Sequence, residues 1–379
     1  MDNLFLNSIT IISGTILLIA ILAVLTSPFL KKLKIQKTAD TCQQNVVLPQ
    51  ISIVIYAHEQ ATVLAQNLPA LLEQAYSSYY QVIVVTDKDQ LDTEELMKQL
   101  CSKYSHLYVT SLPNSSRYMS RKKLAITLGV KAAQTEWILI TEPTCRPCHT
   151  AKHMTDSVGF VMGYTALSSD SPKSWQFEHA MQAYLRLFSA AHQRPWSTNS
   201  PNIALRKSMF MKNEGFRNNL QFIRGEYDFL VNEYARETST NIAIDKDEWL
   251  YEDKLNKAEW KNLHTNFLAI RSKLHGQVQY RTKIFFYSLL SHISIIISSL
   301  GIAGGIILKQ WILLGASAFA LLLLVLLQTL LARRVNKFLE TPVGNASLFF
   351  CGISYCWRSL GYRFQYWRAD KVSFCSHKL

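Results

Sequence analysis

The chain has 379 residues, a formal net charge of +13 and seven cysteines, and apolar residues make up 49% of it. Long apolar runs gather in residues 4–30 and 284–332, which leaves between them about one α/β domain. Many basic residues flank these runs, as at an anionic membrane face, and this disfavours a nucleic-acid-binding protein. Seven scattered cysteines argue against a disulfide scaffold and indicate free thiols in a reducing compartment.

Residues 1–33 are predicted to form an N-terminal transmembrane anchor. The apolar run is long enough to cross a hydrocarbon layer of about 30 Å. No basic residue precedes it and no small-residue cleavage pattern follows it, so a cleaved signal peptide is the minor alternative. Residues 34–48 are predicted to be a linker.

The central domain, residues 49–275, alternates between predicted strands and helices. Short apolar, β-branched runs predict strands at residues 50–56, 81–85, 107–109 and 136–141. Apolar residues at helical spacing predict a helix after each of the first three strands, and Ser120 is a candidate cap for the third. This alternation predicts a mainly parallel α/β sheet covered by helices on both faces.

Polar residues follow three of these strands. Glu59 lies just beyond the first, Asp87 beyond the second, and Glu142-Pro143-Thr144 beyond the fourth. Ligands of such sheets bind beyond the carboxyl ends of the strands, so we expect a binding site there. The sequence has no phosphate-cradling glycine-rich loop, which disfavours dinucleotide-binding and P-loop proteins.

Three consecutive cations, Arg121, Lys122 and Lys123, open the predicted third helix of this domain. A charge run at a helix start is often a solvated face. The helix dipole disfavours cations at this end, however, so an anionic partner such as a diphosphate is the competing explanation.

Residues 284–332 are predicted to form a transmembrane helical hairpin that breaks at Lys309-Gln310. Residues 341–379 combine aromatic rings with arginines, which is typical of an amphipathic segment in the headgroup region. Basic clusters after the first and third spans place both of those ends in the cytoplasm. The predicted location is therefore a bacterial-type inner membrane, with the central domain cytoplasmic and the N-terminus outside.

Residues 49–271 resemble a known family. The segments are ISIVIYAHEQATVLAQNLPALLEQAY, QVIVVTDKDQLDTEELMKQL, RKKLAITLGVKAAQTEWILITEPTC, QRPWSTNSPNIALRKSMFMKNEGF and GEYDFLVN. In order and spacing they are similar to family 2 glycosyltransferases that are anchored in membranes. The resemblance implies a GT-A type fold and inverting transfer of a sugar from a nucleotide-sugar donor to an acceptor hydroxyl.

The resemblance also implies roles for particular residues. Asp87 would recognise the base or ribose, and Glu59, Lys122, Lys123 and Glu142 would complete the donor site. Glu142 and Thr144 would hold a divalent metal, Mg or Mn, on the diphosphate.

A carboxylate, Glu226 or Asp228, would accept the proton of the acceptor hydroxyl. Two motifs depart from the family pattern. Glu142-Pro143-Thr144 stands where the family has Asp-x-Asp, and Tyr227 occupies the position of the base between the two candidate carboxylates.

The predicted function is transfer of a sugar to a membrane-proximal acceptor, lipid-linked or polysaccharide, in polysaccharide or glycolipid biosynthesis. Because the metal and base motifs are altered, the alternative is a catalytically degenerate, glycosyltransferase-like scaffold that binds a partner. A transporter is disfavoured because no paired ionisable residues lie within the predicted spans.

Cys145-Arg146-Pro147-Cys148-His149 has the spacing of a haem attachment site. Haem is attached outside the cytoplasm, whereas this segment is predicted to be cytoplasmic. These cysteines, with His149 and His153, are also suitable zinc ligands. The family resembled above has an ordinary loop at this position, so neither metal site is favoured.

Overall fold

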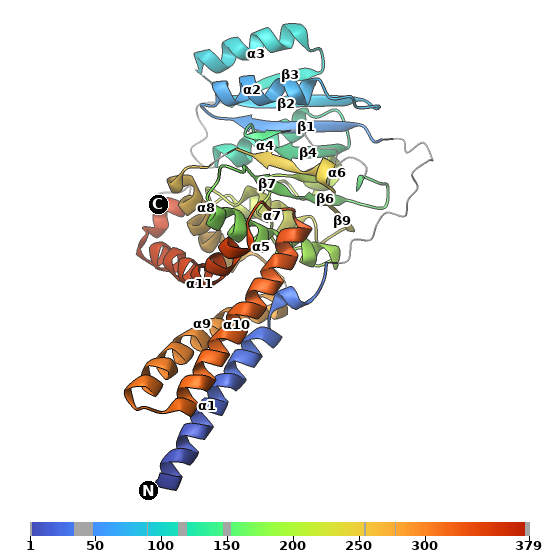
Figure 1. Ribbon diagram of the computed structural model, residues 1–379. Coiled ribbons are helices and arrows are strands. Elements are labelled where there is room, and N and C mark those ends of the chain that lie inside the picture. Colours follow the sequence, from blue (N-terminus) through green and yellow to red (C-terminus); the bar gives the residue numbers. More distant parts are fainter. Residues whose placement is uncertain are drawn as a thin grey trace. The chain divides into compact units, whose positions relative to one another are not determined.

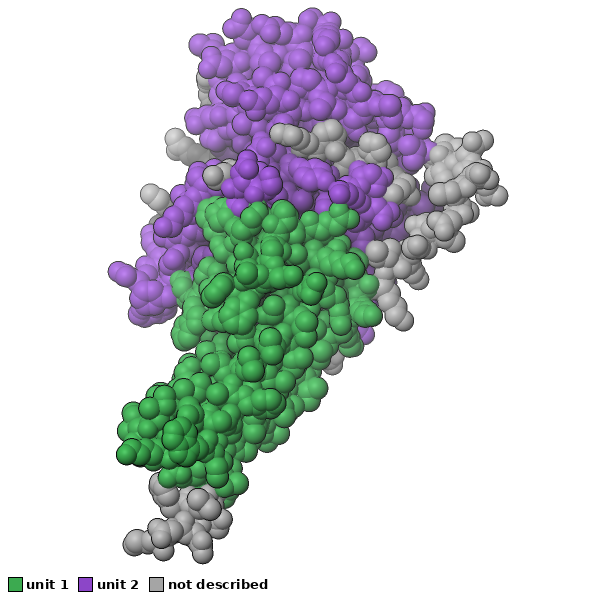
Figure 2. Space-filling model, viewed as in Figure 1, with its two compact units in different colours: residues 1–33, 172–185, 277–361 green, residues 34–171, 186–276, 362–379 purple. Residues whose placement is uncertain are grey.

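A computed structural model describes residues 2–33, 48–88, 90–112, 120–146, 153–253, 255–276 and 278–375. The chain divides into two compact units (Figure 2). Unit 1 comprises residues 1–33, 172–185 and 277–361, and unit 2 comprises residues 34–171, 186–276 and 362–379. Unit 1 contains the long apolar helices, and unit 2 contains the β-sheets. The predicted linker, apart from its last residue, lies outside the described residues.

Three long helices of unit 1, α1 (Asp2–Leu25), α9 (Val278–Ile307) and α10 (Trp311–Phe338), pack against one another. They are the blue and orange helices of Figure 1. Among the described residues these three are long and apolar enough to cross a membrane. The turn between α9 and α10 falls at the predicted break, where Lys309 adopts a positive φ of 53°.

Small residues let α9 and α10 approach closely. A Cβ on Gly305 would lie 2.7 Å from the backbone nitrogen of Leu314, and one on Gly301 would lie 2.1 Å from the hydroxyl of Ser317. Close backbone approach of this kind favours association of apolar helices in lipid, where the hydrophobic effect between helices is absent.

The aromatic and basic C-terminal segment forms α11 (Asn345–Arg368), followed by the short helix η6 (Lys371–Phe374). Within unit 1, Arg358 of α11 donates from Nε to Glu178 Oε2 at 3.4 Å, and Phe177 packs against Tyr355 at 6.0 Å between ring centroids. Phe177 and Glu178 belong to α5 (Lys173–Ala191), so this helix anchors the unit 1 part of α11.

Unit 2 is built on a seven-stranded sheet with the order β3-β2-β1-β4-β8-β6-β9. Strands β1, β2, β3 and β4 pair in parallel, β8 is antiparallel to both of its neighbours, and β9 is parallel to β6. The strands are β1 (Ile51–Ala57), β2 (Tyr80–Asp87), β3 (Leu107–Leu112), β4 (Trp137–Thr141), β6 (Phe160–Gly163), β8 (Ile203–Arg206) and β9 (Thr240–Ala243). The mainly parallel sheet and its four predicted strands are confirmed.

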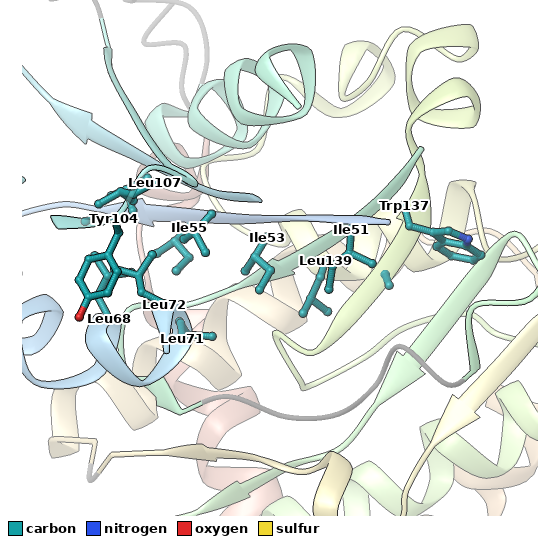
Figure 3. Close-up of a cluster of buried hydrophobic side chains, with 14 of the residues drawn as sticks. Ile51, Ile53, Ile55, Leu68, Leu71, Leu72, Tyr104, Leu107, Trp137 and Leu139 are labelled. Carbon is teal, nitrogen blue, oxygen red and sulfur yellow. The ribbon is translucent and has the colours of Figure 1, made fainter. Parts of the chain in front are cut away.

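Strand β1 is buried on both faces, which explains its continuous apolar run. Ile51, Ile53 and Ile55 join a core with Leu68 and the other leucines of α2 (Ala61–Leu72), as Figure 3 shows. The core also includes Met97 of α3 (Leu91–Lys103). Val54 points to the opposite face, against α4 (Arg121–Ala132). Helices therefore cover both faces, as a parallel sheet requires.

The strand order reverses at β1. The chain proceeds from β1 to β2 on one side of it and later returns to place β4 on the other side. Such a reversal of strand order leaves room for a ligand beyond the strand ends. The loops that follow β1, β2 and β4 all reach this edge of the sheet.

The second half of unit 2 contains elements that short-range periodicity does not reveal. A small sheet has the order β5-β10-β7, from β5 (Cys145–Arg146), β10 (Leu250–Glu252) and β7 (Thr165–Leu167). Strands this short carry no readable alternation. The remaining helices are α6 (Lys207–Lys212), α7 (Glu226–Glu233) and α8 (Lys257–Ile270).

Gly129 allows α4 to pack directly on β1, because an added Cβ would lie 2.3 Å from Cγ1 of the fully buried Val54. Alanine is favoured over glycine within a helix, but here the clash dominates. We expect Gly129→Ala to lower the free energy of unfolding by about 1–3 kcal/mol. Thermal unfolding of the purified protein measures the change. Lys131→Ala, at an exposed site of the same helix, is the control, and equal stability of the two variants would contradict the packing argument.

Candidate active site

Five segments of unit 2 bring polar side chains to the carboxyl edge of β1, β2 and β4. They are the ends of these three strands, the first turn of α4 and the first turn of α7. The first turn of α4 contains no acidic residue, whereas that of α7 contains Glu226 and Asp228. Basic side chains at the start of α4 therefore contact carboxylates at the start of α7 and at the strand ends.

Asp87 is buried at the end of β2 and is surrounded by hydrogen-bond donors. Arg121 donates from Nε to Asp87 Oδ1 at 2.7 Å, and the Tyr56 hydroxyl donates to Oδ2 at 2.9 Å. His58 Nδ1 also contacts Oδ2. Burial alone would raise the pKa of Asp87, but the hydrogen bonds, led by Arg121, hold it below its usual value. Asp87 is therefore a fixed carboxylate, and its predicted role at the base or ribose stays a prediction.

Lys122 lies between the two altered motifs. Its ammonium forms an ion pair with Glu142 at the end of β4, and a second with Glu226 Oε1 of α7 at 2.9 Å. It also lies 4.9 Å from the centroid of the Tyr227 ring. Burial opposes the charged form, but the two carboxylates outweigh it, and the pKa of Lys122 is raised above its usual value. The lysine therefore remains charged.

Lys123 points in a different direction and has a different role. It is fully buried, and its ammonium donates to the carbonyl oxygens of Asn219 at 2.6 Å and Phe222 at 2.8 Å. Burial lowers its pKa to about 8. The structure thus assigns Lys123 to holding the segment before α7 in place, which does not support its predicted contact with the donor.

Glu142 and Thr144 do not form a site that suits a divalent metal. The Oε1 atom of Glu142 is occupied by the Lys122 ammonium and by the Tyr227 hydroxyl, which donates to it at 2.6 Å. Thr144 offers only a hydroxyl where a second carboxylate is needed. Among the described residues, no group of three or more His, Cys, Asp and Glu side chains is arranged to hold a metal ion. These residues therefore support no catalytic step through a metal.

The two predicted base residues have opposite environments. Burial would raise the pKa of Glu226, but the charges of Lys122 and Arg224 hold it below its usual value. Burial raises the pKa of Asp228 to about 6, although it accepts hydrogen bonds from the Ser197 hydroxyl at 2.7 Å and the Thr198 amide at 3.2 Å. A base works best when its pKa lies near the working pH, which favours Asp228.

Tyr227, at the predicted base position, cannot itself act as a base near neutral pH. Its burial and the nearby charge of Glu142 raise its pKa well above the usual value, so the phenol stays protonated. Its hydroxyl instead fixes Glu142.

Glu59 is exposed at a positive φ of 53°, and its amide donates to Gln90 Oε1 at 3.1 Å. The role of its carboxylate at the predicted donor site stays a prediction. In the alternative zinc motif, Cys148 and His149 lie outside the described residues, and His153 pairs with Glu248 at 2.6 Å.

Sequence reasoning missed Glu252 and Arg224. Burial, assisted by the charge of Glu142, raises the pKa of Glu252 to about 7. Glu252 reaches this region because β10 pairs with β5, which places it opposite Cys145. No sequence motif marks that pairing. Arg224 is exposed two residues before Glu226, and its charge acts on both Lys122 and Glu226.

Comparison with known families identifies this half of the domain. The model of the family described as "Glycosyl transferase family 2" matches residues 52–142, which include β1 to β4, Asp87, Lys122 and Glu142. The chain carries a glycosyl transferase family 2 domain. The predicted enzyme class, a glycosyltransferase, is thereby confirmed. No curated protein matches the chain.

Two solved structures are similar to this chain. Mannosyltransferase PcManGT from Pyrobaculum calidifontis, in complex with GDP-Man and Mn2+, matches with a TM-score of 0.55 and 14% identity, over 92% of this chain and 99% of that one. S. aureus TarS 1–349, in complex with UDP, matches with a TM-score of 0.41 and 14% identity, over 81% and 91%. The mannosyltransferase confirms the predicted GT-A type fold, and at this identity it shows the fold alone.

Lys123→Met tests the structural role of the buried ammonium. Methionine fills a similar volume but leaves the carbonyl oxygens of Asn219 and Phe222 without this donor. We expect the free energy of unfolding to fall by about 2–4 kcal/mol, since the Phe222 carbonyl loses the ammonium donor and the Asn219 carbonyl keeps only the Phe222 amide at 3.3 Å. Thermal or denaturant unfolding measures the loss. Lys131→Met, exposed on the same helix, is the control, and a Lys123→Met variant as stable as that control would refute the assignment.

Proposed function

We propose that this glycosyltransferase moves a sugar, with inversion, from a nucleoside diphosphate donor to a hydroxyl of a lipid-linked or polysaccharide acceptor at the membrane surface. The observation that carries the proposal is the convergence of Asp87, Lys122, Glu142 and Glu226 beyond the carboxyl ends of the strands of the family 2 domain. Ligands of open α/β sheets bind at this place.

The donor side of the site suits a nucleoside diphosphate sugar. The complex of the similar mannosyltransferase with GDP-Man supports this donor class. The fixed carboxylate of Asp87 can accept a hydrogen bond from the base or ribose only if one of its own donors gives way. Glu226 Oε2 is buried with no hydrogen-bond partner among the described residues, which leaves an acceptor for a sugar hydroxyl.

In the proposed step, the acceptor oxygen attacks the anomeric carbon from the side opposite the leaving diphosphate. The new carbon–oxygen bond forms as the bond to the diphosphate breaks, and the electron pair leaves with the nucleoside diphosphate. The Asp228 carboxylate takes the proton of the acceptor hydroxyl. Attack from the opposite side inverts the configuration at that carbon.

The membrane side of the proposal comes from unit 1. Its three candidate spans would hold the chain in a membrane, and the basic residues after the first and third spans favour a cytoplasmic catalytic domain. The domain limits of the sequence analysis and the bacterial-type inner membrane remain predictions. The amphipathic C-terminal helix would lie near the acceptor at the interface.

Asp228→Asn tests the base and, with it, the proposed reaction. Asparagine keeps the shape and can still accept from Ser197 and Thr198, but it cannot take a proton. We expect kcat to fall about 10²–10⁴-fold with little change in nucleotide affinity. Release of UDP or GDP from a panel of nucleotide sugars, by the full chain in membranes with extracted lipid acceptors, measures kcat.

The pH profile of the same pair of proteins separates a base from a structural carboxylate. Because Asp228 must be deprotonated to act, kcat/KM of the unaltered protein should rise with pH through about 6. The residual kcat/KM of Asp228→Asn should not show this rise with pH. Asp170→Asn, at an exposed site, is the control. An Asp228→Asn enzyme with an unchanged rate and profile excludes Asp228 as the base, and no turnover of any donor favours the scaffold alternative.

Cysteine labelling tests the proposed topology. Cys101 is exposed in unit 2, so a membrane-impermeant maleimide should label the unaltered protein in inverted vesicles but not in intact cells. Leu308→Cys, in the turn between α9 and α10, should add labelling in intact cells. Labelling of the unaltered protein in intact cells would reverse the orientation.

A further inference from the structure

The three cations in the first turn of α4 have different partners. Arg121 pairs with Asp87, and Lys123 is taken up by backbone carbonyls. Lys122 alone forms ion pairs with two carboxylates, those of Glu142 and Glu226. Glu142 stands at the position of the family's metal motif, and Glu226 directly precedes Tyr227 at the predicted base position. The ammonium thus lies where the sequence led us to expect a divalent metal.

The surroundings of Lys122 fix this charge rigidly. The side chains of Lys122, Glu142 and Glu226 are 13%, 19% and 6% exposed. The Tyr227 hydroxyl donates to the same Glu142 oxygen at 2.6 Å, and its ring lies beneath the ammonium. An ammonium has three N–H donors, and Glu142 and Glu226 take two of them. One donor is left for a ligand.

A second cation belongs to the same region. Arg224 lies on the segment that leads into α7, and it is exposed, so its guanidinium is accessible to a ligand. Arg224 lies two residues before Glu226, which forms an ion pair with Lys122, so it is close to this cluster along the chain. Its charge also acts on both Lys122 and Glu226. A lysine and an arginine together carry two positive charges, as a divalent cation does.

We propose that Lys122 and Arg224 together replace the divalent cation, so that this glycosyltransferase binds the donor diphosphate and stabilises its departure without a metal. The inference rests on the proposed function, whose leaving group is a nucleoside diphosphate. Lys122 supplies the fixed charge beside the breaking bond, and Arg224 supplies a planar pair of donors suited to phosphate oxygens. Preorganised cations lower the barrier because charge develops on the diphosphate as it leaves.

The altered residues of both motifs fit this arrangement. A site that coordinates no metal does not need a carboxylate at position 144, so Thr144 is compatible with it. Tyr227 stands where the family has a carboxylate, so no third negative charge lies beside Lys122. Its neutral hydroxyl orients Glu142. Had Tyr227 been an aspartate, the ammonium would face one more carboxylate and would be less available to a phosphate.

The test is the affinity of the full chain in lipid nanodiscs for UDP and for GDP, with excess EDTA or with Mn2+, by isothermal titration calorimetry. We expect the dissociation constants for the better nucleotide to agree within about threefold between the two conditions. With EDTA present, Lys122→Met should weaken binding about tenfold or more, and Arg224→Gln about three- to tenfold. Arg217→Gln is the control, because Arg217 is exposed and pairs with Glu214.

Each other outcome has a definite meaning. Binding that EDTA abolishes and Mn2+ restores overturns the two-cation assignment and leaves the proposed function intact. Unaltered affinity in a folded Lys122→Met protein shows that the ion pairs are only structural, and overturns it too. If Lys122→Met does not fold, Arg224→Gln decides, since an exposed arginine is not needed for folding and its unchanged affinity refutes the assignment. No binding of any common nucleoside diphosphate, UDP and GDP included, by the unaltered protein refutes the proposed function itself.

Discussion

The ion pairs of Lys122 are the interaction on which the site depends. They connect the first turn of α4 to the end of β4 through Glu142, and to the start of α7 through Glu226. Breaking one partner of a buried pair is costly, because the remaining charge loses its compensation. These ion pairs therefore hold together the half of the domain that the family model matches and the half that it does not match. They do so at the place where a donor would bind.

The sheet makes this contact possible. The carboxyl ends of β1, β2 and β4 reach one edge, and the strand order reverses around β1. Ligands of open α/β sheets bind at such a place. Helix α4 is held firmly against β1 by the glycine contact at Val54, so its first turn cannot drift from the strand ends. Rigid elements thus present the cations, as a preorganised electrostatic site requires.

Environment, more than residue type, divides the roles of neighbouring groups. Lys122 and Lys123 are adjacent, yet one faces carboxylates and the other faces backbone carbonyls. Glu226 and Asp228 are two residues apart on α7, and burial raises the pKa of Asp228 while nearby cations lower that of Glu226. Pairs of titratable groups whose environments push their pKa values apart are typical of acid–base sites.

The sequence by itself determined the elements with strong local signals. Continuous apolar runs predicted β1 to β4 and the three candidate spans, because burial on all sides leaves a pattern that is readable along the chain. The same runs placed Asp87 and Glu142 at strand ends. Only the tertiary structure decided that Lys122 bridges Glu142 and Glu226, that Lys123 is structural, and that Glu252 enters the site. These depend on contacts between residues far apart in the chain, and on short strands whose pairing is fixed by packing and not by local sequence.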